Sequence, residues 1–319
     1  MKILEVNNLS ISYVIDSKVI NIVNGISFSI NYSEILGVIG ESGSGKTQTA
    51  LAILGLLSKK SIVTGSIKFM GNELVNLPEK KFMQLRSKEI AVVFQDPTTS
   101  LNPYLTIKKQ MIESLMFHQK LSMSEAVSKS LKMLDFVKIP DAKDKINLYP
   151  HELSGGMKQR ITIAMSLLCE PKLLIADEIT ASLDVTTQSQ ILDLLLSLKK
   201  EFNMSIMMIS HDFGVVAHLC DYVNVMYSGS ILESASVYDI FYAPHHPYTI
   251  GLLNSITNIA DNKKILKSIR GEPPQVGEEK IGCVFKNRCD SVLEGCLTNT
   301  INIYDLSDSH KVKCILNYK

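Results

Sequence analysis

A glycine-rich octapeptide between an apolar strand and a helix constrains the fold of this chain more than any other feature. Gly40-Glu41-Ser42-Gly43-Ser44-Gly45-Lys46-Thr47 fits the pattern GxxxxGK[ST], follows the apolar run Ile35–Ile39 and leads into the helical pattern Thr47–Leu57. Glycines at this spacing let successive backbone N–H groups curl around a triphosphate, and the start of the helix adds positive potential. We therefore expect Lys46 to reach the β- and γ-phosphates of a nucleotide and the Thr47 hydroxyl to ligate Mg²⁺.

A second apolar run ends on two acidic residues. Leu173–Ala176 is followed by Asp177 and Glu178. A carboxylate at the end of a buried strand is where the Mg²⁺ shell of a nucleotide site needs one, and Glu178 can polarise an attacking water as a general base. An acidic pair alone is usually the start of a solvated loop. Beside the glycine-rich loop, it is the expected second half of a nucleotide site.

A third motif places another anion site in the same chain. Ser154, Gly155 and Gly156 precede a helical pattern that includes Met157 and Ile161. A hydroxyl and free N–H groups at a helix N-terminus can bind an anion. A lone Ser-Gly-Gly is more often only the N-cap of a helix. The presence of the two other motifs favours the anion site.

The pattern of apolar runs predicts an α/β fold. Ile90–Phe94, Leu173–Ala176 and Ile206–Ile209 are short runs suited to parallel strands buried on both faces. The first thirty residues predict an antiparallel β layer. From Thr106 to about Asp144 the pattern is helical and polar, which predicts an all-α insertion between two strands.

At this point the sequence resembles the ATP-binding subunit of an ABC transporter, because Leu153–Arg160 (LSGGMKQR) matches the signature motif of that superfamily. The resemblance implies a P-loop NTPase core over residues 1–236, with a helical subdomain at about 104–165, and a C-terminal extension over 237–319. It also implies two subunits that close head to tail. Each ATP then lies between the phosphate loop of one subunit and the signature of the other.

The resemblance assigns five further positions. Tyr13 matches the aromatic residue that stacks on adenine, and Gln95 matches the glutamine that contacts Mg²⁺ or water and couples to the membrane subunit. His211 matches the switch histidine that contacts the γ-phosphate. Ser182 and Asp184 match the D-loop, which lies across the dimer interface.

These assignments form four sets with distinct roles. The ATP-binding set comprises Tyr13, residues 40–47, Gln95, Asp177 and His211. The catalytic set comprises Gln95, Glu178 and His211, and the Mg²⁺ ligands are Thr47, Gln95 and Asp177. The set that contacts the ATP of the partner subunit comprises Ser154, Gly155, Gly156 and Gln159.

Two positions depart from the family pattern. Ile179 stands where the family usually has proline after the acidic pair, which leaves the φ of that residue freer. Lys158 replaces a commoner arginine, so the charge is kept and the planar fork is lost. Asp177 and Glu178 are both kept, so we expect the site to hydrolyse ATP.

Three stretches indicate the subfamily. Gln95–Pro103, His246-Pro247-Tyr248-Thr249 and Gly271-Glu272-Pro273-Pro274 resemble the oligopeptide, dipeptide and nickel importers. The resemblance implies an ATP-hydrolysing motor that works with two permease subunits, a homologous second ATPase and an extracytoplasmic substrate-binding protein. Peptides are favoured as cargo, with nickel or another small solute as the alternative. A soluble ABC ATPase of DNA repair is disfavoured, because the interval from Gln95 to Ser154 is too short for a long coiled coil or a zinc module.

The last stretch of the chain holds four closely spaced cysteines, Cys283, Cys289, Cys296 and Cys314. Four thiols can hold a zinc ion or an iron–sulfur cluster. Structural zinc sites usually contain one C-x₂₋₄-C pair, which is missing from this spacing. The spacing and the resemblance favour a [4Fe–4S] cluster over zinc, with unliganded thiols as the third reading. The two remaining cysteines, Cys169 and Cys220, lie in apolar context and are expected in the core.

Composition favours a chain that is soluble or peripheral to a membrane and stays in the cytosol, and the resemblance implies a peripheral subunit at the cytoplasmic face of the cell membrane. Its 33 basic and 32 acidic side chains leave a net charge of +1, which gives no bulk attraction to nucleic acid. The longest apolar runs fall well short of the roughly 20 residues that span a bilayer. The N-terminus turns polar at Asn7, before a secretory apolar segment could form.

Overall fold

The structure is a computed structural model that describes residues 1–181, 183–255, 269–275, 278 and 281–317. The chain divides into two compact units. Unit 1 comprises Met1–Asn76 and Ile209–Lys319, and unit 2 comprises Leu77–Met208.

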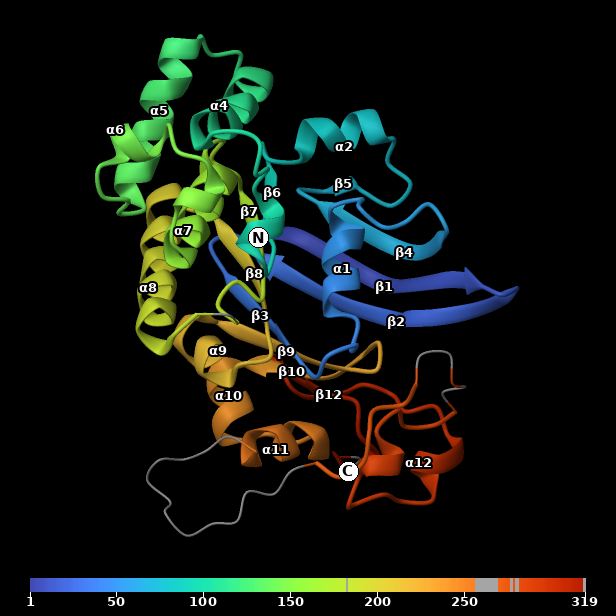
Figure 1. The fold of residues 1–319 in the computed structure, drawn as a ribbon. Helices are drawn as coiled ribbons and strands as arrows, with labels where there is room; N and C mark the ends of the chain where they lie inside the picture. The colour runs from blue at the N-terminus through green and yellow to red at the C-terminus, as the bar shows by residue number, and fades with distance from the viewer. Residues whose placement is uncertain (182, 256–268, 276–277, 279–280, 318–319) are drawn as a thin grey trace. The chain divides into compact units, whose positions relative to one another are not determined.

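Unit 1 begins with an antiparallel sheet, as the sequence predicts. Its strands lie in the order β2-β1-β4-β5, and the long β1–β2 pair is prominent in Figure 1. Their bounds are β1 Lys2–Ile15, β2 Lys18–Asn31, β4 Ser61–Phe69 and β5 Asn72–Glu73. Apolar side chains that alternate along β1 are buried, which is the pattern of a sheet with one face on the core. β4 and β5 do not correspond to any run predicted to be a strand.

A second group of strands in unit 1 includes two strands from the C-terminal extension. The predicted run Ile35–Ile39 is β3, which pairs in parallel with β9 (Tyr222–Tyr227). β10 (Ser230–Ser236) pairs with β9, and β12 (His310–Val312) pairs with β10. β11 (Tyr304–Ser307) forms the edge beside β12. The extension therefore adds two strands to the sheet that begins with β3.

The helical segments of unit 1 are short. α1 ends at Ile53 instead of Leu57, because Gly55 takes a φ of 62° and closes a Schellman motif in which Leu56 N donates to Leu51 O at 2.8 Å. The α-helices are α1 Lys46–Ile53, α9 Phe213–Leu219, α10 Val237–Tyr242, α11 Pro247–Asn254 and α12 Gly295–Thr298. Two 3₁₀ turns are η2 Lys286–Arg288 and η3 Ile315–Asn317.

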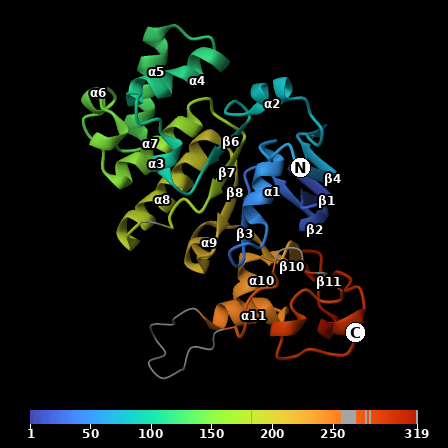
Figure 2. The same cartoon turned by 45° about the vertical axis from the view of Figure 1, so that its right-hand side comes forward.

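Unit 2 contains parallel strands and most of the longer helices. β6 (Ile90–Val93) pairs in parallel with β7 (Leu173–Asp177), and β8 (Ser205–Ser210) contributes its first four residues. The helical segments are α2 Glu79–Leu85, α3 Pro97–Ser100, α4 Ile107–His118, α5 Met123–Phe136, α6 Ala142–Lys145, η1 Pro150–Glu152, α7 Gly155–Leu167 and α8 Val185–Phe202. Residues 106–144, all of them described, form helices without strands, as predicted. Figure 2 shows α4 and α5 side by side.

Local sequence explains where these helices start. Ser122 caps α5 in a reciprocal capping box with Glu125, and Thr106 caps α4. Cys169 and Cys220 are buried, as expected of small apolar residues. Among the residues that the structure describes, no helix combines the length and the hydropathy needed to cross a bilayer.

Candidate functional site

The glycine-rich loop of unit 1 joins β3 to α1 through residues with left-handed backbone. Gly40, Gly43 and Gly45 have φ values of 152°, 77° and 102°. A Cβ atom on Gly40 would overlap the carbonyl oxygen of Met226, so only glycine fits there. The loop thus brings its backbone into a tight curl at the N-terminus of α1, where helix N–H groups favour an anion.

Lys46 lies inside this curl. Its side-chain ammonium donates to Gly40 O at 2.7 Å, to Glu41 O at 2.9 Å and to Ser44 Oγ at 3.4 Å. The residue is only 5% exposed. A buried ammonium needs such acceptors, and the strong charge of a polyphosphate would compete for the same three donors.

Two other predicted site residues belong to unit 1. The Tyr13 hydroxyl donates to Gln48 Oε1 on α1 at 2.6 Å, so β1 and the first turn of α1 are joined beside the loop. Burial raises the pKa of Tyr13. His211 is exposed directly after β8. Asp212 then caps α9 by accepting from Gly214 N at 2.7 Å.

In unit 2 the acidic pair lies at the end of β7. Asp177 is the last residue of the strand and is buried. Glu178 follows with a φ of 50°, a left-handed conformation that is uncommon for a residue with a side chain. Ile179, which stands where the family has proline, is 2% exposed and therefore packs into the core of the unit.

The Ser-Gly-Gly segment begins α7. The Ser154 hydroxyl accepts from Met157 N at 3.4 Å, so Ser154 is the N-cap of the helix. A Cβ atom on Gly155 would meet nothing within 4 Å, and one on Gly156 would meet only Thr187 at an ordinary 3.5 Å. Glycine in a helix costs roughly 0.5–1 kcal/mol relative to alanine. Among the residues that the structure describes, none therefore gives a steric reason for either glycine.

Gln159 and Arg160, later in the same motif, differ in their contacts. Gln159 is 1% exposed, and its Nε2 has no hydrogen-bond partner in the described part of the chain. Arg160 donates to Val137 O at 3.0 Å and to Gln190 Oε1 at 2.9 Å.

Asp184 caps α8 by accepting from Thr187 N at 2.9 Å. The hydrogen bonds from Thr187 hold the pKa of Asp184 below its usual value. The other predicted D-loop residue, Ser182, lies outside the described residues.

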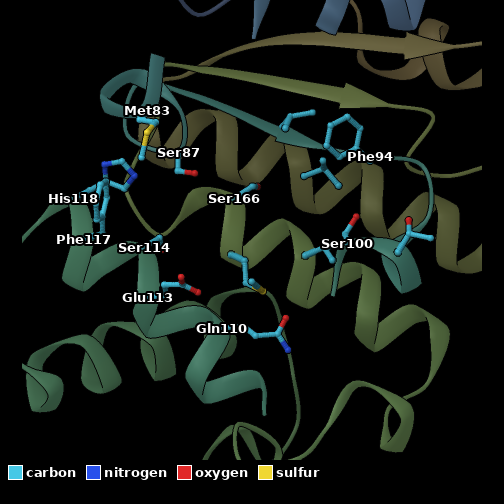
Figure 3. Close-up of a pocket in the computed structure, with 15 residues that line it drawn as sticks. Met83, Ser87, Phe94, Ser100, Gln110, Glu113, Ser114, Phe117, His118 and Ser166 are labelled. Carbon is cyan, nitrogen blue, oxygen red and sulfur yellow. The ribbon is translucent and has the colours of Figure 1, made fainter. Parts of the chain in front are cut away.

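Gln95 is exposed after β6, close in sequence to the rim of a hollow of about 700 Å³ in unit 2. The hollow is lined from β6, α3, α4 and α7, and Figure 3 shows Phe94, Gln110, Glu113 and Phe117 along it. Phe94 is 36% exposed and Phe117 is 52% exposed, so the rim presents aromatic surface to solvent.

The four cysteines of the extension gather in unit 1. Cys283 N donates to Cys296 O at 2.8 Å. Burial, together with the smaller effect of the neighbouring Cys283, Cys289 and Cys296, raises the pKa of the Cys314 thiol to about 11. Over the described residues, no three side chains of His, Cys, Asp or Glu lie close enough together to hold a metal ion.

Comparison with known proteins identifies the family. Residues 23–181 match the family model "ABC transporter", and residues 232–296 match "Oligopeptide/dipeptide transporter, C-terminal region". The oligopeptide transport ATP-binding protein OppD of Salmonella typhimurium is 48% identical over 92% of this chain and 88% of its own length. The dipeptide transport ATP-binding protein DppD of Bacillus subtilis is 42% identical over 99% of this chain and 95% of its own. The chain belongs to the ATP-binding subunits of ABC transporters.

Solved structures agree with this assignment. The subunit resembles cbiO1 from Clostridium perfringens, part of the ABC transporter complex cbiONQ, at 29% identity and a TM-score of 0.65 over 76% of this chain and 91% of that one. The ATP-binding cassette MJ0796, in a dimeric state bound to ADP and phosphate, has the same fold with a TM-score of 0.66 at 24% identity over 73% of this chain and 98% of that one. The subunit is an ABC ATPase with a P-loop α/β fold, and it binds ATP.

Proposed function

We propose that this ABC ATPase drives the import of oligopeptides or dipeptides. The proposal is supported by the named relatives and by the match of residues 232–296 to the C-terminal region of oligopeptide and dipeptide transporters. The observation that supports the motor role is that two helices of one chain, α1 and α7, begin at glycine-rich segments suited to binding phosphate. An ATPase of this kind supplies no pore, so it needs permease subunits.

We propose that residues 40–47 bind the phosphates of the chain's own ATP. Lys46 supports this role because its three donors converge within the curl of the loop. Tyr13 stacks on adenine, His211 contacts the γ-phosphate, and Glu178 polarises the attacking water. Mg²⁺ would neutralise negative charge on the phosphates when bound. Its proposed ligands are Thr47, Gln95 and Asp177.

We propose that α7 contacts the ATP of a homologous partner subunit through Ser154, Gly155 and Gly156, with Ser182 and Asp184 at the dimer interface. The fourth predicted contact residue, Gln159, is 1% exposed and instead packs inside unit 2. The two glycines support the proposed contact because no neighbour in the described part of the chain needs them to be small. Close approach of another molecule is a physical reason for glycine at such a site.

We propose that the hollow beside Phe94 receives a segment of a permease subunit. Its exposed aromatic rim and its volume of about 700 Å³ suit the burial of an apolar side chain from a partner. Docking there would hold the ATPase at the cytoplasmic face of the membrane. Import further requires a second permease subunit and an extracytoplasmic substrate-binding protein.

We propose that Cys283, Cys289, Cys296 and Cys314 hold a [4Fe–4S] cluster. Four cysteines are the complement that such a cluster requires, and three of the four are buried away from solvent. The cluster would serve as a cross-link for a tail that has few helices and strands of its own. In this division of labour, residues 1–236 form the ATPase domain, with its helical subdomain at about 104–165, and residues 237–319 form the extension.

The cluster is tested by purifying the chain without oxygen and measuring iron, sulfide and zinc. We expect iron and acid-labile sulfide in equal amounts, both lost in Cys289→Ser. The matched control is Cys169→Ser, which changes a buried cysteine of unit 2 and should keep the iron. Zinc alone, or a metal-free chain, would contradict the proposal.

The cargo is tested in proteoliposomes that contain the chain with its permease subunits and binding protein. We expect ATP-dependent uptake of labelled peptides and loss of uptake in Lys46→Ala. Uptake of Ni²⁺ without uptake of peptides would contradict peptide import.

A further inference from the structure

Two residues of the C-terminal extension form hydrogen bonds with Glu41 of the phosphate loop. Both the side chain and the backbone N–H of Glu41 have partners in the extension, at Arg288 and Tyr248. All three residues belong to unit 1. None of these contacts was evident from the sequence, because 247 positions separate Glu41 from Arg288.

Arg288 forms a largely buried ion pair with the loop. Its Nη1 lies 2.7 Å from Glu41 Oε2, and the two side chains are 6% and 25% exposed. The same nitrogen donates to the Tyr227 hydroxyl at 3.3 Å, and Nε donates to Arg270 O at 2.9 Å. The Tyr227 hydroxyl and Arg270 O therefore help to fix the orientation in which the guanidinium contacts Glu41.

Tyr248 holds the backbone of the same loop residue. Its hydroxyl accepts from Glu41 N at 3.0 Å. Tyr248 N donates to His246 Nδ1 at 3.0 Å, and its ring packs against Tyr227 and Phe285 with centroids 4.6 and 5.2 Å away. Tyr248 is fully buried, so its hydroxyl has a fixed position.

Glu41 in turn shapes the part of the loop that faces the nucleotide. Its carbonyl oxygen accepts from Lys46 Nζ at 2.9 Å and from Ser44 N at 3.2 Å. A shift of Glu41 would therefore move the acceptors around Lys46. Small displacements of a binding group can reduce function a hundredfold.

We propose that Arg288 and Tyr248 are positioning residues for ATP binding, which hold Glu41 so that the phosphate loop keeps its binding shape. The inference rests on the proposed role of residues 40–47 in binding ATP. It gives the extension a part in nucleotide binding: the ATP site reaches full affinity only when residues around Arg288 are folded. By linkage, ATP binding must stabilise the extension to the same degree.

Titration of the full-length chain with a fluorescent ATP analogue and Mg²⁺ tests the proposal. We expect Arg288→Met to weaken ATP binding about tenfold, within the range of coupling between linked sites. Arg288→Lys should recover part of the affinity, because it keeps the charge and loses the fork. Tyr248→Phe removes only the hydroxyl and keeps the ring, and it should weaken binding about threefold, the scale of one hydrogen bond.

A cycle of single and double variants tests whether Arg288 positions Glu41 or only neutralises its carboxylate. Glu41→Gln leaves no carboxylate for Arg288, so the double variant Arg288→Met/Glu41→Gln should bind ATP no better than Arg288→Met alone. If Arg288 served only to neutralise a carboxylate near the phosphates, Glu41→Gln would restore affinity to Arg288→Met. That restoration would overturn the proposal.

Hydrogen exchange distinguishes a positioning role of Arg288 in ATP binding from a purely structural role. ATP should slow the exchange of amides around η2 in the wild-type chain, and much less in Arg288→Met. The matched control is Arg86→Met, which breaks the ion pair of Arg86 and Glu79 at 2.6 Å in unit 2 and should change neither affinity nor protection.

Unchanged ATP affinity in both Arg288→Met and Tyr248→Phe would overturn the inference. Undiminished ATP binding in Lys46→Ala would instead contradict the proposed function.

Discussion

Glu178 combines a proposed catalytic carboxylate with an unusual backbone conformation. Its φ of 50° lies in the left-handed region, where a residue with a side chain costs of order 1 kcal/mol or more. The turn that follows is closed by Ala181 N, which donates to Glu178 O at 3.1 Å. The conformation turns the chain sharply at the end of β7, directly after the buried Asp177.

Glu178→Gln tests the carboxylate alone, because glutamine has nearly the same shape. We expect ATP binding to be retained and kcat to fall by about 10²-fold or more, the scale of a positioned general base. The measurement is steady-state ATP hydrolysis by the assembled complex. Glu170→Gln is a matched control, since Glu170 also has a positive φ of 58° and lies in unit 2. A similar loss in both variants would indicate a backbone effect.

At the scale of elements, α7 begins with two glycines that its own packing does not require. Gly155→Ala should stabilise the chain by up to about 1 kcal/mol, because alanine loses less backbone freedom in a helix. The added methyl group should nonetheless lower ATP hydrolysis roughly tenfold if a partner's ATP approaches there, the scale of an overpacked contact. A thermal melt and an ATPase assay of the same sample check both effects. A more stable variant with unchanged hydrolysis would argue against a ligand at this site.

A buried histidine is the N-cap of α11, and we expect it to make the stability of the folded chain depend on pH. His246 is 1% exposed, its Nδ1 accepts from Tyr248 N, and its backbone N–H donates to Glu233 at 3.0 Å. Burial lowers the pKa of His246 to about 3. The unfolded chain, with a histidine pKa near 6.5, therefore binds a proton that the folded chain does not, and stability falls as the pH drops below that value.

His246→Asn measures this contribution. Asparagine is a good N-cap, so the helix start is kept while the titrating group is removed. Between pH 7 and pH 5 the wild-type chain should lose about 2 kcal/mol more unfolding free energy than the variant. Urea unfolding at the two pH values checks this. Equal losses in the two chains would show that His246 does not set the pH dependence.

The proposed head-to-tail pairing of two subunits assigns the N-termini of α1 and α7 to different ATP molecules. Ser154→Arg should leave the ATP affinity of the isolated chain unchanged, because the proposed phosphate contacts of that chain are Lys46 and Thr47, and should abolish hydrolysis in the assembled complex. Nucleotide titration and an ATPase assay distinguish these effects. Ser122→Arg removes another N-cap, that of α5, and should keep hydrolysis. Loss of ATP affinity in isolated Ser154→Arg would place Ser154 in its own chain's ATP site.

The sequence by itself determined the elements whose signals are local. β3 coincides with the apolar run Ile35–Ile39, and β6, β7 and β8 differ from their predicted runs by one residue at one or both ends. Continuous apolar runs bounded by turn residues are enough to define buried strands. The motifs at 40–47, 153–160 and 177–178 were recognisable for the same reason, since each is a short contiguous segment.

The contacts that the extension forms with the rest of unit 1 depend on the tertiary structure. β11 and β12 are too short and polar to be recognised in isolation, and they form because β10 offers an edge with which β12 pairs. His246-Pro247-Tyr248 indicated a subfamily in the sequence, but its contact with Glu41 depends on the path of the chain. Arg288 had no sequence signal, because an ion pair between residues 247 positions apart leaves no local pattern. The physical reason is that periodicity reports which face of an element is buried, whereas partners across the fold are set only when the elements pack.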